Sequence, residues 1–177
     1  MRARSVLLAL CALASLLIGP AQAQTSQEEV KATFVYRFVS FVSWPAAAFE
    51  DTATPVRLCV VGTDPFAHTL SRIVADQRIG VRAFEVRRIA GAADMDACHA
   101  VYVVGDRTAA VLRAARQRPV LIITDSVSGG ERGIIHFALV EGRVRFYIDD
   151  ANAAESGLGV DPRLLNLALA VRRRAGS

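Results

Sequence analysis

Three short apolar runs recur along the chain, at residues 56–61, 100–104 and 120–124. Each has the length of a strand and no polar face, which is typical of strands buried on both sides of a parallel sheet. Parallel neighbours need a crossover connection, and helical patterns at 65–75 and 107–116 supply it. The sequence therefore predicts an α/β fold with a mostly parallel central sheet.

Two further elements precede and interleave with these runs. Ser26 and Glu29 form a capping box, and apolar residues at helical spacing then predict a helix over 27–43 that ends before Pro45. Residues 82–89 alternate apolar and charged side chains, so we expect a half-exposed edge strand there.

The pattern changes after Gly133. Two apolar segments, 134–140 and 143–148, flank the turn Glu141-Gly142 and predict an antiparallel hairpin. Asp161-Pro162 then predicts the start of a last helix that continues through Val171 to the arginines at 172–174. The expected architecture is a three-layer sandwich with a C-terminal antiparallel hairpin and flanking helices.

The N-terminus has the pattern of a secretory signal peptide. Arg2 and Arg4 precede an apolar run at 6–18, and Ala21-Gln22-Ala23 offers a cleavage site. The run is shorter than the roughly 20 residues that a membrane span needs. We therefore expect cleavage after Ala23, export without membrane insertion, and one domain over 24–177.

Charge and residue usage exclude several classes of function. The formal net charge is +4, of which Arg2 and Arg4 supply two units, and this is too small for a nucleic-acid footprint. The only lysine is Lys31, within the first predicted helix. Phosphate-loop and Schiff-base enzymes need a lysine on a loop or a strand end, so we expect no cofactor and no enzymatic activity.

The two cysteines of the mature chain, Cys59 and Cys98, are an even count in an exported protein. They lie in or beside strands that are expected to pair, so a disulfide is favoured over two buried free thiols. The histidines lack metal-ligand spacing, apart from the adjacent Cys98-His99, which would point to opposite faces of a strand. We expect no metal site.

A possible ligand site follows from strand ends. Gly62, Asp64 and Asp125 lie where predicted parallel strands end, and open α/β sheets bind ligands at that edge. An aspartate before a helix is more often its N-cap, and this is the favoured explanation of Asp64.

The chain resembles the YfiR/HmsC-like family of periplasmic regulatory proteins. The resemblance rests on an ordered set of segments that covers nearly the whole mature chain. These are Val30–Phe38 with Phe41-Val42-Ser43-Trp44-Pro45, Leu58–Gly62 with Asp64-Pro65-Phe66, Ala97-Cys98-His99, Gly133-Ile134-Ile135, Arg143–Phe146 and Leu164–Ala168.

The resemblance implies a function. Members of this family repress an inner-membrane diguanylate cyclase by binding its periplasmic sensor domain, and an outer-membrane lipoprotein relieves the repression. It also implies a homodimer, and a disulfide between the positions matching Cys59 and Cys98. A different class of function stays open: a periplasmic small-molecule binder that serves a sensor kinase or a TonB-dependent uptake system.

A regulator of this kind needs an interface rather than catalytic residues. Aromatic side chains dominate interface energies, and Trp44, Phe49 and Tyr147 are the candidates for partner contacts. Tyr147 falls on the polar phase of its strand, whereas Phe41 and Phe146 are equally explained by core packing.

Overall fold

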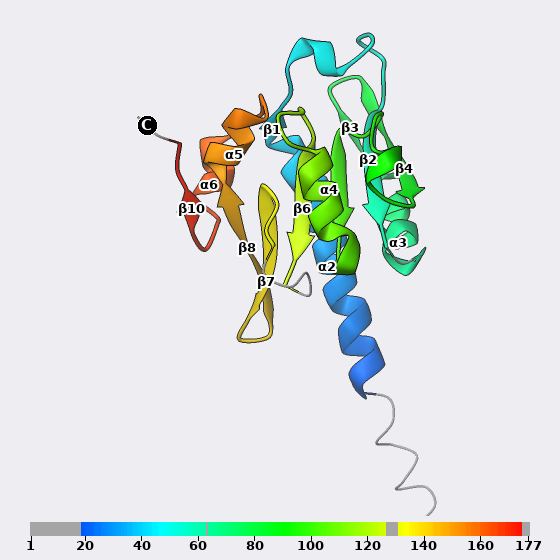
Figure 1. Cartoon of the computed structure of the whole chain (residues 1–177). Coiled ribbons are helices and arrows are strands. Elements are labelled where there is room, and N and C mark those ends of the chain that lie inside the picture. Colours follow the sequence, from blue (N-terminus) through cyan, green and yellow to red (C-terminus); the bar gives the residue numbers. More distant parts are fainter. Residues whose placement is uncertain (1–18, 63, 127–130, 175–177) are drawn as a thin grey trace, which may run out of the picture.

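The computed structural model describes residues 19–62, 64–126 and 131–174, and side chains only from residue 27 onward and not that of Asp64. Its centre is an eight-stranded sheet in the order β10-β8-β7-β6-β5-β2-β4-β3 (Figure 1). The parallel part consists of β4 (Arg82–Ile89), β2 (Val56–Val61), β5 (Ala100–Val103), β6 (Leu121–Asp125) and β7 (Ile135–Val140). The predicted α/β fold and its mostly parallel sheet are confirmed.

The predicted hairpin is also confirmed. Strand β8 (Arg143–Asp149) pairs antiparallel with β7, in a register that places Phe137 opposite Phe146. Both turn residues have left-handed backbone, with φ of 50° at Glu141 and 74° at Gly142, as a tight hairpin requires.

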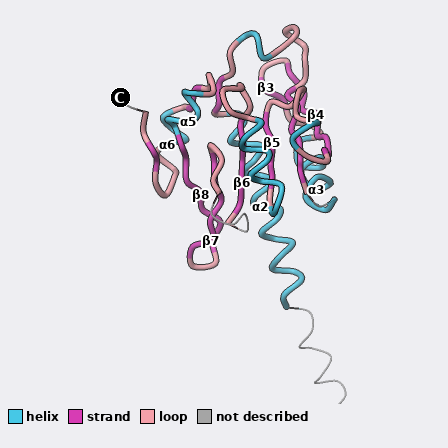
Figure 2. The backbone as a smooth tube through the Cα atoms, viewed as in Figure 1, coloured by secondary structure: helices cyan, strands magenta, loops and turns pink. Residues whose placement is uncertain are grey.

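Helices cover the two faces of the sheet unequally (Figure 2). On one face, α2 (Gly19–Ser40) and α3 (Asp64–Val74) bury a large core that includes Leu58, Phe38 and Phe137. On the other face, α4 (Thr108–Ala114) and the 3-10 turn η2 (Ala92–Asp94) cover a smaller core, which includes Cys59 and Val101. Residues alternate between the two cores along β2 because successive strand side chains point to opposite faces.

The first helix differs from its predicted bounds. It begins at Gly19 and ends at Ser40, and the chain then forms the short strand β1 (Val42–Ser43), which pairs with β9 (Gly159–Val160). The backbone N–H of Asp161 also donates to the carbonyl of Phe41, so a tertiary contact ends the helix earlier than Pro45 would.

Most of the predicted signal peptide, residues 1–18, lies outside the described part of the chain. Residues 19–23 form the start of α2, so the expected cleavage point after Ala23 falls within this helix. Among the residues that the structure describes, no helix combines the length and apolar character of a membrane span.

The predicted last helix is wrong in extent. Helix α6 (Pro162–Leu165) has only four residues, capped by the side chain of Asp161. Val171 and Arg172 instead form β10, which pairs in parallel with β8. The open edge of β8 supplies hydrogen-bond partners there, and this long-range pairing overrides the local helical pattern.

Two smaller corrections concern the sheet edge and a missed helix. The strand at 82–89 is not the edge, because the two-residue β3 (Arg78–Ile79) pairs with it on the outer side. Helix α5 (Asp150–Glu155) was not predicted; it begins directly after β8, where the carboxylate of Asp149 accepts from the backbone N–H of Asn152.

Candidate functional site

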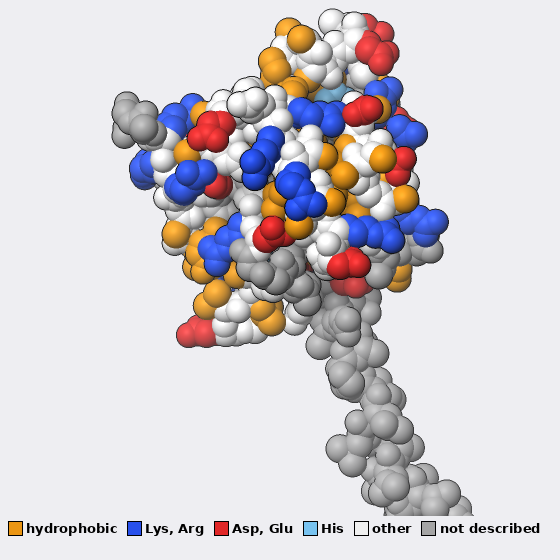
Figure 3. Space-filling model, viewed as in Figure 1, with side chains coloured by type: hydrophobic (Ala, Val, Ile, Leu, Met, Phe, Trp, Pro, Cys, Tyr) orange, Lys and Arg blue, Asp and Glu red, His pale blue; other side chains and the backbone are white. Residues whose placement is uncertain are grey.

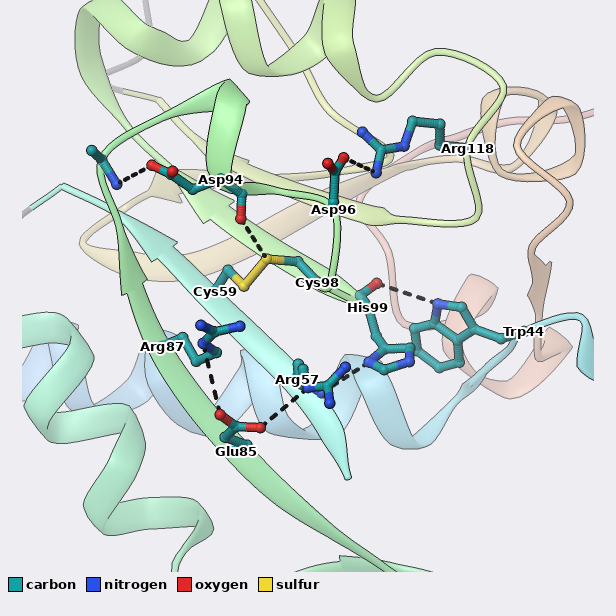
Figure 4. The surroundings of a disulfide bond; sticks show 11 residues. Trp44, Arg57, Cys59, Glu85, Arg87, Asp94, Asp96, Cys98, His99 and Arg118 are labelled. Atoms are coloured by element: carbon teal, nitrogen blue, oxygen red, sulfur yellow. Dashed lines mark hydrogen bonds and ion pairs between the residues drawn. A yellow bond between two sulfur atoms is a disulfide. The ribbon is translucent and has the colours of Figure 1, made fainter. Parts of the chain in front are cut away.

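A disulfide joins Cys59 on β2 to Cys98, which lies just before β5, as predicted (Figure 4). The two Cα atoms are 5.9 Å apart, and both residues are buried in the smaller core. The bond links positions separated by 39 residues. The alternative of two free thiols is therefore wrong.

The residue next to the disulfide, His99, has both ring nitrogens bonded. Nδ1 accepts from the backbone N–H of Arg57 at 3.0 Å, so Nε2 carries the proton and donates to the carbonyl of Ala48 at 3.0 Å. Burial lowers the pKa of His99, and the charges of Arg57 and Arg82 lower it further, against the opposing effect of the Ala48 bond. This histidine is neutral and structural, as expected.

Trp44 and Phe49, two predicted partner contacts, both pack around His99. The Trp44 indole N–H donates to the His99 carbonyl at 3.2 Å, and the Phe49 ring stacks on the imidazole with centroids 4.4 Å apart. The Arg82 guanidinium lies 3.9 Å from the Phe49 centroid and donates to the carbonyls of Asp51 and Thr54. These contacts fix the loop that follows β1 against the sheet.

Tyr147, the third predicted partner contact, lies elsewhere. It is on β8, which β7 and β6 separate from the strand that follows His99. Tyr147 is half-buried opposite His136, and the Arg132 guanidinium lies 4.6 Å from the centre of its ring. The structure thus brings Trp44 and Phe49 together but not Tyr147.

The face around Tyr147 is the part of the sheet that α4 leaves uncovered. Phe137 and Phe146 point into the larger core, so the alternate residues on these strands point the other way. The smaller core beneath α4 draws on β2, β4, β5 and β6, and within the described chain it contains no residue of β7 or β8. On this face Arg145 is exposed and Ala138 partly buried near the hairpin turn, whereas His136, opposite Tyr147, is buried.

The three predicted ligand residues differ in their surroundings. Gly62 is exposed, and Asp64 begins α3. Asp125 is buried: Lys31 Nζ lies 2.5 Å from its Oδ2, and the hydroxyls of Tyr102 and Ser126 donate to it at 3.1 and 3.0 Å. The Asp125 carboxylate therefore already has internal partners.

Two grooves lie on the α4 side of the molecule instead. The larger, of about 570 Å³, lies between α4 and α5, and the other, of about 390 Å³, lies beside Tyr147 and β10. Arg132 lines both, and neither includes Gly62, Asp64 or Asp125. The sequence did not indicate them, because the walls of the larger groove come from four separate segments and those of the smaller one from three.

No group of three potential metal ligands occurs among the described histidines, cysteines and acidic residues.

Comparison with known proteins gives one clear result. No individual curated protein matches the sequence, but residues 28–169 match the YfiR/HmsC-like family. That range includes the disulfide, the loop around His99 and both strands of the hairpin. The chain belongs to the YfiR/HmsC-like family of non-catalytic, periplasmic regulators of cyclic di-GMP signalling.

Proposed function

We propose that this protein binds the periplasmic sensor domain of an inner-membrane diguanylate cyclase and thereby represses cyclic di-GMP synthesis. It acts by association, without catalysis. Its family supports the regulatory role. The described chain also offers no metal cluster, and its buried aspartate at a strand end is already bound by Lys31.

The face of β7 and β8 that lies beyond the smaller core beneath α4 carries the proposal. Sheet faces in this fold are normally covered, and here one half of a face carries Tyr147 with Arg132 over its ring. Tyrosine and arginine are, with tryptophan, the residues enriched among interface hot spots. We therefore assign the partner contact to this face, with Tyr147 at its centre.

Trp44 and Phe49 are proposed as a second contact region. Both are half-buried and both hold the loop against His99, so their removal also loosens that loop. Tyr147 is the better probe of binding, because its described ring contacts are with Arg132 and His136 on the same face.

The same proposal includes a homodimer, and release of repression by an outer-membrane lipoprotein. The alternative function is that of a small-molecule binder for a sensor kinase or an uptake receptor. Crosslinking in the native periplasm separates the two: capture of a cyclase sensor domain supports repression, and capture of a kinase or receptor overturns it.

Binding of the purified chain to the captured periplasmic domain then tests whether the face around Tyr147 makes the partner contact. Tyr147→Ala should weaken binding roughly tenfold, whereas Tyr147→Phe, which keeps the ring, should stay close to wild type. Val81→Ala removes an exposed apolar side chain, 71% accessible, at the turn between β3 and β4, and serves as the matched control. Wild-type binding by a folded Tyr147→Ala variant would exclude this face.

A further inference from the structure

The groove between α4 and α5 has the size and lining of a small-molecule site. Its volume of about 570 Å³ lies within the range of ligand pockets. Its floor includes the buried side chains of Val120, Ile122 and Ile134, and its apolar wall comes from the partly exposed Ala109 and Leu112 of α4. Asn152 and Ser156 from α5 add polar groups to the lining.

Three arginines supply the charge of this groove. Arg113 is in the last turn of α4, Arg116 follows the helix, and Arg132 precedes β7. Among the described residues, none of the three guanidinium groups is within ion-pair distance of a carboxylate, although Arg132 lies over Tyr147. Figure 3 shows basic side chains distributed over this side of the molecule.

The three arginines of the groove differ from several other arginines of the chain, which are paired with carboxylates. Arg118, Arg172 and Arg174 each lie within 3.0 Å of an aspartate oxygen. Two carboxylates, Glu131 and Glu155, also line the groove, yet neither pairs with its arginines. The groove therefore keeps guanidinium donors available beside an apolar surface.

We propose that this groove binds a small organic oxyanion: a carboxylate or a phosphate monoester with an apolar body. The apolar body lies against Ala109 and Leu112, and the oxyanion accepts hydrogen bonds from Arg113 and Arg116. Guanidinium groups match the planar geometry of both carboxylate and phosphate oxygens. A ligand of this class contacts both the arginines and the apolar lining of the groove, whereas inorganic phosphate contacts only the arginines.

Isothermal titration calorimetry on the oxidised mature chain tests the site with four probes. Phenyl phosphate and benzoate separate the two head groups, inorganic phosphate lacks the apolar body, and benzyl alcohol lacks the charge. We expect one or both aromatic anions to bind with a Kd below about 1 mM, and inorganic phosphate and benzyl alcohol to bind at least tenfold more weakly. The assay needs no partner protein, so its result is independent of the proposed repressor function.

Substitutions of basic and acidic groove residues should change the affinity for the anion in opposite directions. The double variant Arg113→Gln/Arg116→Gln should weaken binding of the better anion at least tenfold, because it removes both charge-assisted hydrogen-bond donors to the oxyanion. Glu155→Gln should strengthen it, since a nearby negative charge is removed. Arg143→Gln, at the hairpin turn and outside the groove, is the charge-matched control and should leave binding unchanged.

Three outcomes would each overturn the site. The first is that neither aromatic anion binds at concentrations up to about 10 mM. The second is that benzyl alcohol binds as tightly as benzoate, and the third is that the control variant weakens binding as much as the groove variant does. Substitution of a surface arginine with glutamine should have little effect on stability. Circular dichroism melts verify that each variant is folded.

Discussion

Lys31, the only lysine of the chain, donates from α2 to the buried carboxylate of Asp125 at the end of β6, with Nζ 2.5 Å from Oδ2. Burial alone would raise the pKa of Asp125. The ion pair with Lys31 and the hydrogen bonds from Ser126 and Tyr102 outweigh that effect and hold the pKa below its usual value. The pair connects the helical layer to the sheet through a charged contact within an apolar core.

Replacing Lys31 with methionine should destabilise the protein strongly at neutral pH. Asp125, with only 2% of its side chain exposed, would keep its charge without a cation. Breaking a buried ion pair in this way costs about 3–5 kcal/mol, and the 19% exposure of Lys31 favours the lower end. Urea unfolding measures the loss. The exposed pair Arg72–Glu29 is the control, and Arg72→Gln should cost less than about 1 kcal/mol.

The cost of Lys31→Met should shrink in acid. The folded pKa of Asp125 lies below the unfolded value, so its contribution is present above about pH 4 and is lost as the pH falls through the folded pKa. Without Lys31 the carboxyl protonates at higher pH and its burial is no longer penalised. Adding Asp125→Asn to Lys31→Met should therefore recover part of the stability at pH 7. A penalty that is equal at about pH 7 and pH 4 would contradict this account.

Neutral His99 should make the fold sensitive to mild acid. Its pKa is lowered from 6.5 in the folded chain, so stability is complete above that pH and falls as the pH drops toward the folded value. In the neutral ring, Nδ1 accepts a hydrogen bond from the backbone N–H of Arg57. A protonated Nδ1 would lose this bond, because two donors would then face each other. Each such histidine adds a slope of at most about 1.4 kcal/mol per pH unit, and His136 is also shifted downward.

The variant His99→Gln separates the contribution of His99 to the pH dependence of stability from that of His136. Glutamine keeps a donor and an acceptor but does not titrate, so unfolding free energies measured between about pH 7 and pH 5 should depend less steeply on pH than in the wild type. His68→Gln changes an exposed residue of α3 and should leave the slope unchanged. Equal slopes for wild type and His99→Gln would show that this ring does not titrate in that range.

Local pattern was sufficient for much of this fold. The apolar runs at 56–61 and 100–104 and the hairpin around Gly142 were predictable because strand alternation and turn chemistry are encoded by neighbouring residues. The end of the chain was not. Val171 and its neighbours have a helical pattern, but β8 offers an unpaired edge, and a pairing between residues far apart in sequence replaces the helix.

Some features of the candidate site could be predicted from local sequence, and others could not. The disulfide was predictable, because only two of the three cysteines lie outside the predicted signal peptide and their strands are neighbours. The arginine groove was not, since Arg113 and Arg132 come from different segments and only the fold brings them together. Phe49 stacks on His99 beneath Arg82, a contact that spacing along the sequence does not reveal.

Removal of the disulfide should cost about 4 kcal/mol. The bond closes a loop of 39 residues, and the chain-entropy model gives that value for the constraint on the unfolded state. Guanidinium unfolding of Cys59→Ala/Cys98→Ala, compared with the oxidised wild type, measures the loss. Adding dithiothreitol should destabilise the wild type by a similar amount and leave the double variant unchanged. A reduced wild type as stable as the oxidised form would mean that the bond adds no net stability.

The C-terminal strand should protect the edge of β8. The N–H of Ile148 donates to the carbonyl of Ala170, and Arg174 pairs at 2.6 Å with Asp150, whose side chain is only 6% exposed. Truncation after Leu169 removes both interactions, with an expected loss of about 2–4 kcal/mol, and it opens the strand edge to other chains.

Urea unfolding and size-exclusion chromatography over a range of protein concentrations measure the two effects of this truncation. An unpaired edge is a template for pairing with a second copy, so we expect larger species to increase with concentration beyond the wild-type level. Removal of residues 175–177 alone leaves β10 and Arg174 in place and is the matched control. If the longer truncation keeps wild-type stability and the wild-type elution profile, β10 does not stabilise the sheet and β8 needs no cover there.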